Sequence, residues 1–149
     1  MSKWATVLTC LLSWEVQAAG PNPASPIPQD VSTERYANDL VGGDAIERQF
    51  AARVLRRRVR SAWRIAGRPG DSIPVIEARQ TLANFDLMVA PRCTRQLSER
   101  NVLRACAQIL GMLETEEALT ALHQAAQSAT TRRDKRVIDT AIRQIKAEQ

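Results

Sequence analysis

The chain has 149 residues and a formal net charge of +5, with 44% hydrophobic and 25% charged residues. This length and composition exclude a two-domain enzyme, a wholly disordered chain and a polytopic membrane protein, because one domain takes ~100–200 residues. Aromatic residues make up 4% and His123 is the single histidine, which argues against an aromatic-lined ligand pocket and a multi-histidine metal site.

The N-terminal residues have the order of a secretory signal peptide. Lys3 is followed by an uncharged, mostly apolar run over residues 4–14. Such a run is too short to span a bilayer core of ~30 Å, and it has the ~7–15-residue length of a signal core. Small residues allow cleavage after Ala18 or Gly20. We expect residues 1–18 to be a cleavable signal peptide and the mature protein to be periplasmic or secreted; the alternative is a helix of a cytoplasmic protein.

A proline-rich segment follows at residues 19–31, where four of the seven prolines fall between residues 21 and 28. Proline at this density prevents a helix or a central strand. We therefore expect an extended spacer here, followed by one folded domain over residues 32–149.

From residue 32 onward the apolar residues recur at helical spacing and no stretch alternates with period two. The sequence predicts an all-α fold of six helices with breaks at Gly42-Gly43, at residues 67–71 and at Pro91. The expected helix starts are Ser32 or Thr33, Asp44, Ser72, Ser98, Thr115 and Thr131, the last as a capping box in which Asp134 replaces the usual glutamate.

The helical spacing also predicts a core. The residues assigned to the buried face of the second helix are Ile46, Phe50, Val54 or Leu55, Val59, Ala62 or Trp63, and Ala66. Those of the third are Ile76, Leu82, Phe85 and Val89. The residues expected to be buried are Phe50, Val54, Leu103, Ile109, Leu110, Leu122, Val137, Ile138 and Ile142.

Alternate helices begin near residues 33, 75 and 116, at separations of 42 and 41 residues. HEAT and armadillo arrays repeat every ~40–47 residues. Residues 102–111 (VLRACAQILG) resemble the second helix of a short HEAT-like repeat of the phycobilisome-lyase type, and residues 48–55 and 137–145 resemble it less closely. The resemblance implies an exported bacterial member with a right-handed stack of about three antiparallel helical hairpins, an α-solenoid. A compact helical bundle is the alternative.

Positive charge is concentrated in one helix. Residues 48–68 contain eight arginines and no acid, so this segment carries +8 and the rest of the chain carries 5 − 8 = −3. Five of these arginines follow steps of three and four, which places them on one helix face. Guanidinium groups bind carboxylate and phosphate in a bidentate manner. The predicted anion-binding residues are Arg53, Arg56, Arg57, Arg60 and Arg64.

The identity of the anion follows from the compartment. For an exported chain we expect an acidic protein surface, with anionic lipid headgroups and envelope polysaccharide as other candidates. Nucleic acid is not favoured, since an exported chain does not meet it and only Trp63 interleaves the arginines. A cytoplasmic nucleic-acid binder, a structural helical bundle, and a solvated face neutralised by Glu34, Asp39 and Glu77 are the alternatives.

The remaining reactive residues predict no chemistry. Cys93 and Cys106 lie thirteen residues apart without CxxC spacing, so they form either a disulfide in an oxidising compartment or two unpaired buried thiols. The Glu116-Glu117 pair occupies the first turn of a helix, where the dipole favours carboxylates, and His123 has no nucleophile at a convincing spacing. We expect a non-enzymatic protein without metal or cofactor.

Overall fold

The computed structural model describes residues 29–148, and within this range the protein is helical without strands, which confirms the predicted all-α class. The predicted signal peptide and most of the predicted spacer lie outside the described residues. The helices are α1 (Gln29–Gly42), α2 (Ala45–Ala66), α3 (Ile73–Met88), α4 (Ala90–Arg95), α5 (Leu103–Leu113), α6 (Leu119–Ser128) and α7 (Arg132–Ala147), with 3-10 turns η1 (Gln96–Ser98) and η2 (Glu116–Ala118).

The start of α2 is fixed by the predicted cap. Asp44 Oδ1 accepts hydrogen bonds from the backbone N–H groups of Ile46 (2.8 Å) and Glu47 (2.9 Å). The carboxylate of Glu47 in turn accepts from the backbone N–H of Asp44 at 2.9 Å. This reciprocal box satisfies N–H groups that have no partner inside the helix. The longest helix of the described chain therefore has a well-defined first turn.

Two boundaries differ from the sequence-based expectation. Helix α1 begins at Gln29, so residues 29–31 are helical and do not belong to the spacer. Helix α3 ends at Met88, close to the predicted break at Pro91, but Pro91 itself lies in the first turn of a further short helix, α4, that was not predicted. Proline is accommodated there because first-turn N–H groups have no intrahelical acceptor. The described chain consequently has seven α-helices where six were predicted.

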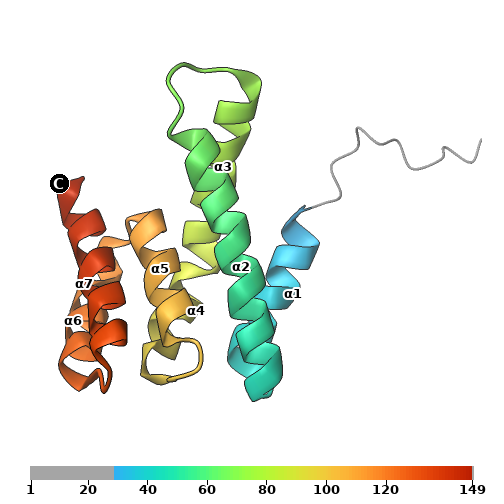
Figure 1. Cartoon of the computed structure of the whole chain (residues 1–149). Coiled ribbons are helices and arrows are strands. Elements are labelled where there is room, and N and C mark those ends of the chain that lie inside the picture. Colours follow the sequence, from blue (N-terminus) through green and yellow to red (C-terminus); the bar gives the residue numbers. More distant parts are fainter. Residues whose placement is uncertain (1–28, 149) are drawn as a thin grey trace, which may run out of the picture.

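Helices that follow one another in sequence pack in pairs, and α5 joins these pairs (Figure 1). Helix α1 packs on α2, α4 on α5, and α6 on α7, while α5 lies between α2 and α7. The C-terminal end of α2 and the beginning of α3 extend beyond the other helices. This arrangement leaves one long side of α2 at the surface of the molecule.

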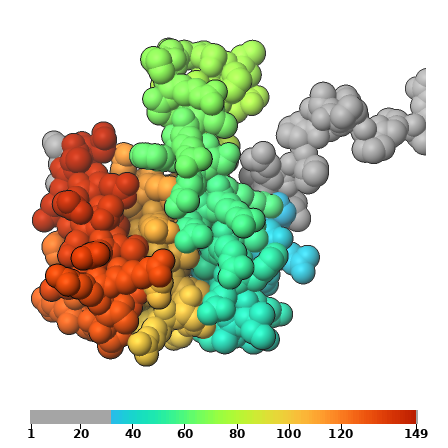
Figure 2. Space-filling view, in the orientation of Figure 1, coloured from blue at the N-terminus to red at the C-terminus, as the bar shows by residue number. Residues whose placement is uncertain are grey.

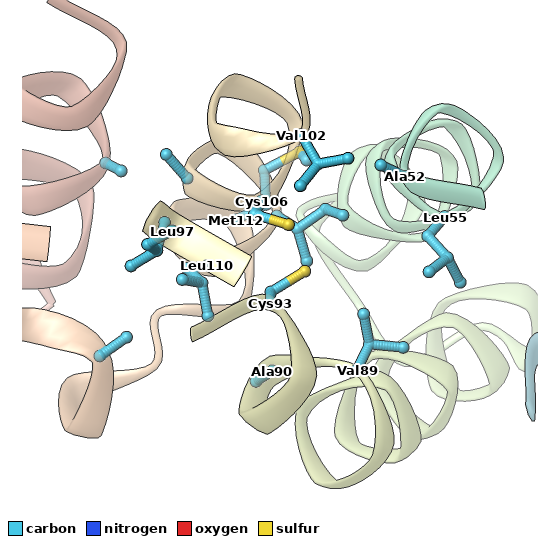
Figure 3. Packing of buried hydrophobic residues seen from close by; sticks show 14 of the residues in the cluster. Ala52, Leu55, Val89, Ala90, Cys93, Leu97, Val102, Cys106, Leu110 and Met112 are labelled. Atoms are coloured by element: carbon cyan, nitrogen blue, oxygen red, sulfur yellow. The ribbon is translucent and has the colours of Figure 1, made fainter. Parts of the chain in front are cut away.

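One hydrophobic core runs through these contacts, and Figure 3 shows its middle, where Cys93 and Cys106 lie between Leu110 on one side and Val89 and Leu55 on the other. Most residues predicted to be buried are buried, and Val54 and Val137 are half-buried. The confirmed residues are Leu103, Ile109, Leu110, Leu122, Ile138 and Ile142.

The predicted core face of α2 is confirmed at Val59 and at the alternatives Leu55 and Ala62, and it is wrong at its first two positions. Phe50 is 55% exposed and Ile46 is 78% exposed. A smaller set of side chains faces the core, because α2 packs against α1, α3 and α5 at once and alanines allow close approach. In α3 the same correction replaces Ile76 by Val75 and Ala78. The buried residues of α2 are Ala51, Ala52, Leu55, Val59 and Ala62.

Candidate functional site

The exposed side of α2 carries the candidate site. Four of the five predicted binding residues are exposed there, and we call them the arginine row: Arg53, Arg57, Arg60 and Arg64. The fifth, Arg56, is half-buried and donates from Nη1 to Gln108 Oε1 of α5 at 3.1 Å. Arg56 therefore helps to hold α2 against α5. Figure 2 shows α2 crossing the near side of the molecule without another helix over it.

No acid neutralises the arginine row within the described residues. The ion pairs of residues 29–148 involve other arginines: Arg35 with Asp39 (3.9 Å), Arg48 with Glu99 (3.8 Å), Arg79 with Asp71 (2.7 Å) and Arg104 with Asp134 (2.7 Å). Of the acids considered as partners from the sequence, Asp39 pairs within its own helix, and Glu34 and Glu77 form no ion pair in this part of the chain. The row therefore forms no ion pair with an acid of the described residues.

The electrostatics of Arg56 report the same excess of charge. Its pKa is lowered from the usual value, first by burial and then by repulsion from Arg60, Arg53 and Arg57. Like charges within a few ångströms disfavour the protonated form of one another. An anion bound along the row would relieve this repulsion, which makes the binding of negative groups favourable here.

Arg58 has a structural role on the flank of α2 that faces α1. Its Nη1 donates to Ser32 Oγ (2.9 Å) and to Thr33 Oγ1 (3.0 Å) of α1. Its guanidinium also lies over the ring of Tyr36, 5.2 Å from the centroid, at a distance typical of a cation–π contact. These contacts fix α1 against α2 and remove Arg58 from the candidate site.

Two residues that the sequence analysis assigned to the core instead extend the exposed side of α2. Ile46 and Phe50 precede the arginine row, and the Phe50 ring contacts Tyr36 of α1 at 6.0 Å between centroids. The signal was present in the sequence, since positions 46, 50, 53, 57, 60 and 64 follow alternating steps of four and three. Large apolar residues at such steps normally indicate a core, and this hid their exposure.

A groove lies beside the site, where the overhanging end of α2 and α3 faces the ends of α5 and α7. Its volume is about 740 Å³. In Figure 2 the surface is hollowed between the end of α7 and the overhanging hairpin. The lining combines apolar and acidic side chains with the last arginine of the row, among them Trp63, Arg64, Asp86, Met112, Glu114 and Glu148.

The other reactive side chains of the described residues do not gather into a metal site. His123 is exposed on α6, and the described residues contain no group of three side chains suited to hold a metal ion. Cys93 and Cys106 are buried free thiols whose side chains are close enough to interact. The structure thus brings the two cysteines together, and the disulfide between them stays a prediction.

Comparison with family models, with curated proteins and with solved structures finds no match to this chain. Among the described helices, none is long and apolar enough to cross a membrane.

Proposed function

We propose that the protein is an exported, non-enzymatic interaction module that binds the acidic surface of a partner protein through the arginine row. The observation that carries the proposal is the exposure of four arginines on one side of α2 with no acid paired to them in the described chain. Export is supported by the signal-like order of residues 1–18, which lie outside the described residues.

The row suits carboxylates because of how it is held. Its four arginines project from one continuous helix of 22 residues, packed on three neighbouring helices. A rigid helix presents the guanidinium groups at fixed spacing, so binding orders side chains and little backbone. Each guanidinium can donate two parallel hydrogen bonds to a carboxylate. Complementary charge of this kind accelerates encounter and selects against basic partners.

We further infer that the domain is a stack of three hairpins, α1 with α2, α4 with α5, and α6 with α7, in the manner of short HEAT-like repeats. Support comes from the contacts within each of these pairs and from the position of α5 between α2 and α7. Helix α3 extends the second hairpin. In such a stack the second helices form a continuous side, and α2 carries the row at one end of it.

The test is affinity capture from native envelope extract with two variants of equal charge change. In the first, Arg53, Arg57, Arg60 and Arg64 become Gln. We expect it to fold like the parent, because exposed substitutions usually change stability by less than ~0.5 kcal/mol each. We also expect it to lose the acidic proteins that the parent captures. Capture by the parent should weaken between 0.1 M and 1 M salt, where the Debye length falls from ~10 Å to ~3 Å.

The control variant removes four exposed positive charges from α7: Arg132, Arg133, Lys135 and Arg136, each to Gln. It should capture the same partners as the parent. Equal capture by the folded α2 variant would overturn the proposal. The proposal would also be overturned, in favour of the nucleic-acid alternative, if the parent retained duplex DNA in preference to acidic protein and the α2 variant did not.

A further inference from the structure

The exposed side of α2 has the spacing of a coiled-coil seam. Six exposed residues follow one another at steps of four and three, and we call them the docking stripe: Ile46, Phe50, Arg53, Arg57, Arg60 and Arg64. Residues repeated in this way recur every 3.5 positions, as the a and d residues of a heptad do. The six residues fall in three successive heptads, and all six side chains are exposed.

A strict 3.5-residue repeat matches one kind of partner geometry. A straight α-helix has 3.6 residues per turn, so a seam with period 3.5 stays in line with a second helix that crosses it at a shallow angle of about 20°. Arg64 lies 18 residues after Ile46, so the stripe is about 27 Å long at 1.5 Å per residue. An extended strand, with a period of two, cannot match these positions. The stripe therefore fits a helix lying along α2.

The chemistry of the stripe is divided along its length. Its first heptad presents exposed apolar residues, Ile46 and Phe50, with 78% and 55% of their surface open to solvent. Its second and third heptads present only arginine. A helix that covers the whole stripe must place apolar side chains against the first heptad and carboxylates at steps of four and three against the rest.

We infer that the partner contacts α2 through an amphipathic helix that has an apolar anchor at one end and glutamate or aspartate at heptad spacing along the remainder. This inference rests on the proposed function and specifies its partner. The apolar end supplies burial, and the arginine row supplies register and selectivity, since charged residues at seam positions fix the pairing of helices.

A second copy of the chain does not satisfy the stripe. Two copies of α2 aligned in parallel would place each arginine row against the other, and antiparallel copies would place the row against Ile46 and Phe50. Both alignments leave guanidinium groups facing one another or an apolar surface, without an acid among the stripe residues. Like charges juxtaposed at an interface suppress association.

The test uses synthetic 22-residue peptides of identical composition, with a fluorescent label, in an Ala- and Gln-rich background. The seam peptide has two Leu followed by four Glu at alternating steps of four and three, made in both orders along the chain because the partner can run either way. The control peptide carries the same Leu and Glu distributed around the helix. Binding to the full mature chain is measured by anisotropy at 0.1 M salt.

We expect one order of the seam peptide to bind at least about tenfold more tightly than the control peptide, which corresponds to about 1.4 kcal/mol. The variant Ile46→Ser should weaken it by about tenfold without altering the fold, because Ile46 is largely exposed. Phe50→Ser provides a second readout, and circular dichroism checks that its lost contact with Tyr36 leaves the helices intact. Replacing the arginine row by Gln should abolish binding of both peptides.

The outcomes separate this inference from the proposed function. Three results together would overturn the helical partner: equal binding of the seam and control peptides, no effect of Ile46→Ser, and loss of binding when the row is replaced. The proposed function, binding of an acidic partner protein, would still stand. Equal binding by the row variant would overturn both. Sedimentation of the chain alone tests for a dimer. If the chain dimerises and Ile46→Ser dissociates the dimer, the assignment of the stripe to another protein is overturned.

Discussion

Arg104 of α5 and Asp134 of α7 are joined at 2.7 Å, from the guanidinium Nε to the carboxylate Oδ1. The side chain of Asp134 is 3% exposed, so this pair connects the two helices at the edge of the core. Thr131 Oγ1 also accepts a hydrogen bond from the backbone N–H of Asp134 at 3.0 Å. One half of the predicted capping box is thus present, while the carboxylate that would complete it is directed to Arg104.

The first prediction concerns the acid stability that this pair confers. The pKa of Asp134 is lowered, first by hydrogen bonding with the Thr131 side chain and then by the hydrogen bond and charge of Arg104 and the charge of Arg100, against the opposing effect of burial. Because the folded pKa lies below that of the unfolded chain, the contribution is full above the ordinary value of about 3.9 and is lost as pH falls through the lowered value.

Asp134→Asn should therefore lower the free energy of unfolding by about 1 kcal/mol at pH 7, and the difference from the parent should shrink in strongly acidic solution. Urea titrations at pH 7 and below pH 4 measure it. Asp139→Asn, an exposed acid of the same helix without an ion pair in the described chain, serves as control. A deficit that stays constant over this pH range would contradict the role assigned to the charge of Asp134.

A second prediction follows from the contact between α5 and α7 at Gly111. A Cβ at Gly111 would lie 2.9 Å from Cα and 3.0 Å from Cβ of Ala141, closer than van der Waals contact allows. We expect Gly111→Ala to destabilise the protein by about 1–2 kcal/mol, because overpacking outweighs the better helix propensity of alanine. Gly67→Ala is the matched control, since its nearest atom is 3.4 Å away and its φ is −75°. Equal midpoints in urea for both variants would refute the close packing.

The third prediction concerns the left-handed residue at the end of α5. Glu114 has φ 56°, a conformation that glycine adopts at lower cost. Its pKa is raised by burial and by the charge of Glu148. A carboxyl whose pKa is raised in the folded state destabilises that state once it is ionised, and the penalty disappears as pH falls below the ordinary value of about 4.3.

Two variants separate the backbone effect from the charge effect. Glu114→Gly should stabilise the protein by about 0.5–1 kcal/mol below about pH 4, where only the backbone effect remains, and by more near neutral pH, where it also removes the ionised carboxylate. Glu114→Gln should stabilise it near neutral pH only and should match the parent below about pH 4. Thermal unfolding at pH 4 and pH 7 distinguishes them. A glycine variant less stable than the parent at both pH values would show that the Glu114 side chain has contacts outweighing its strained backbone.

A fourth prediction uses the two cysteines. The pKa of Cys93 is raised well above its ordinary value by burial and by the hydrogen bond and charge of Cys106. Reduced mature protein should therefore resist alkylation while folded and expose two reactive thiols on unfolding, because the thiolate is the reactive form. If the protein is exported, periplasmic material kept from reductant should show no free thiol after unfolding. Two free thiols in that material would argue against both the disulfide and export.

The sequence predicted helices better than it predicted their faces, and α2 shows why. In α5 and α7 a single apolar stripe exists, so Leu110 and Ile138 could be assigned to the core directly. In α2 two stripes coexist at helical spacing, one beginning with Ile46 and Phe50 and one made largely of alanines. Larger apolar residues outweigh alanines in a transfer-energy argument. The choice between the stripes depends on how many helices pack around α2, which spacing along the chain does not contain.

The candidate site was predicted in part. Steps of three and four placed the arginines on one side of α2, yet they could not separate Arg56 from the row. Around the axis of α2, Arg56 is displaced from the row by less than a quarter turn. This displacement decides whether its side chain reaches Gln108 of α5 or solvent. The short helix that Pro91 opens was missed for a related reason. Proline ends one helix or opens the next with equal ease, and only packing decides between them.

The overhanging end of α2 and α3 has a consequence for how the protein opens. The side chains buried there are small ones, Ala62, Val75 and Ala78, and the end projects past the other helices (Figure 1). Segments with few buried contacts open locally at lower free energy than the whole domain. Amide hydrogens of this end should exchange before those of α5 and α7, and limited proteolysis should cut first within residues 67–72. Arg60 and Arg64 belong to this end, so a ligand bound along the row would slow the opening and protect the chain from that first cut.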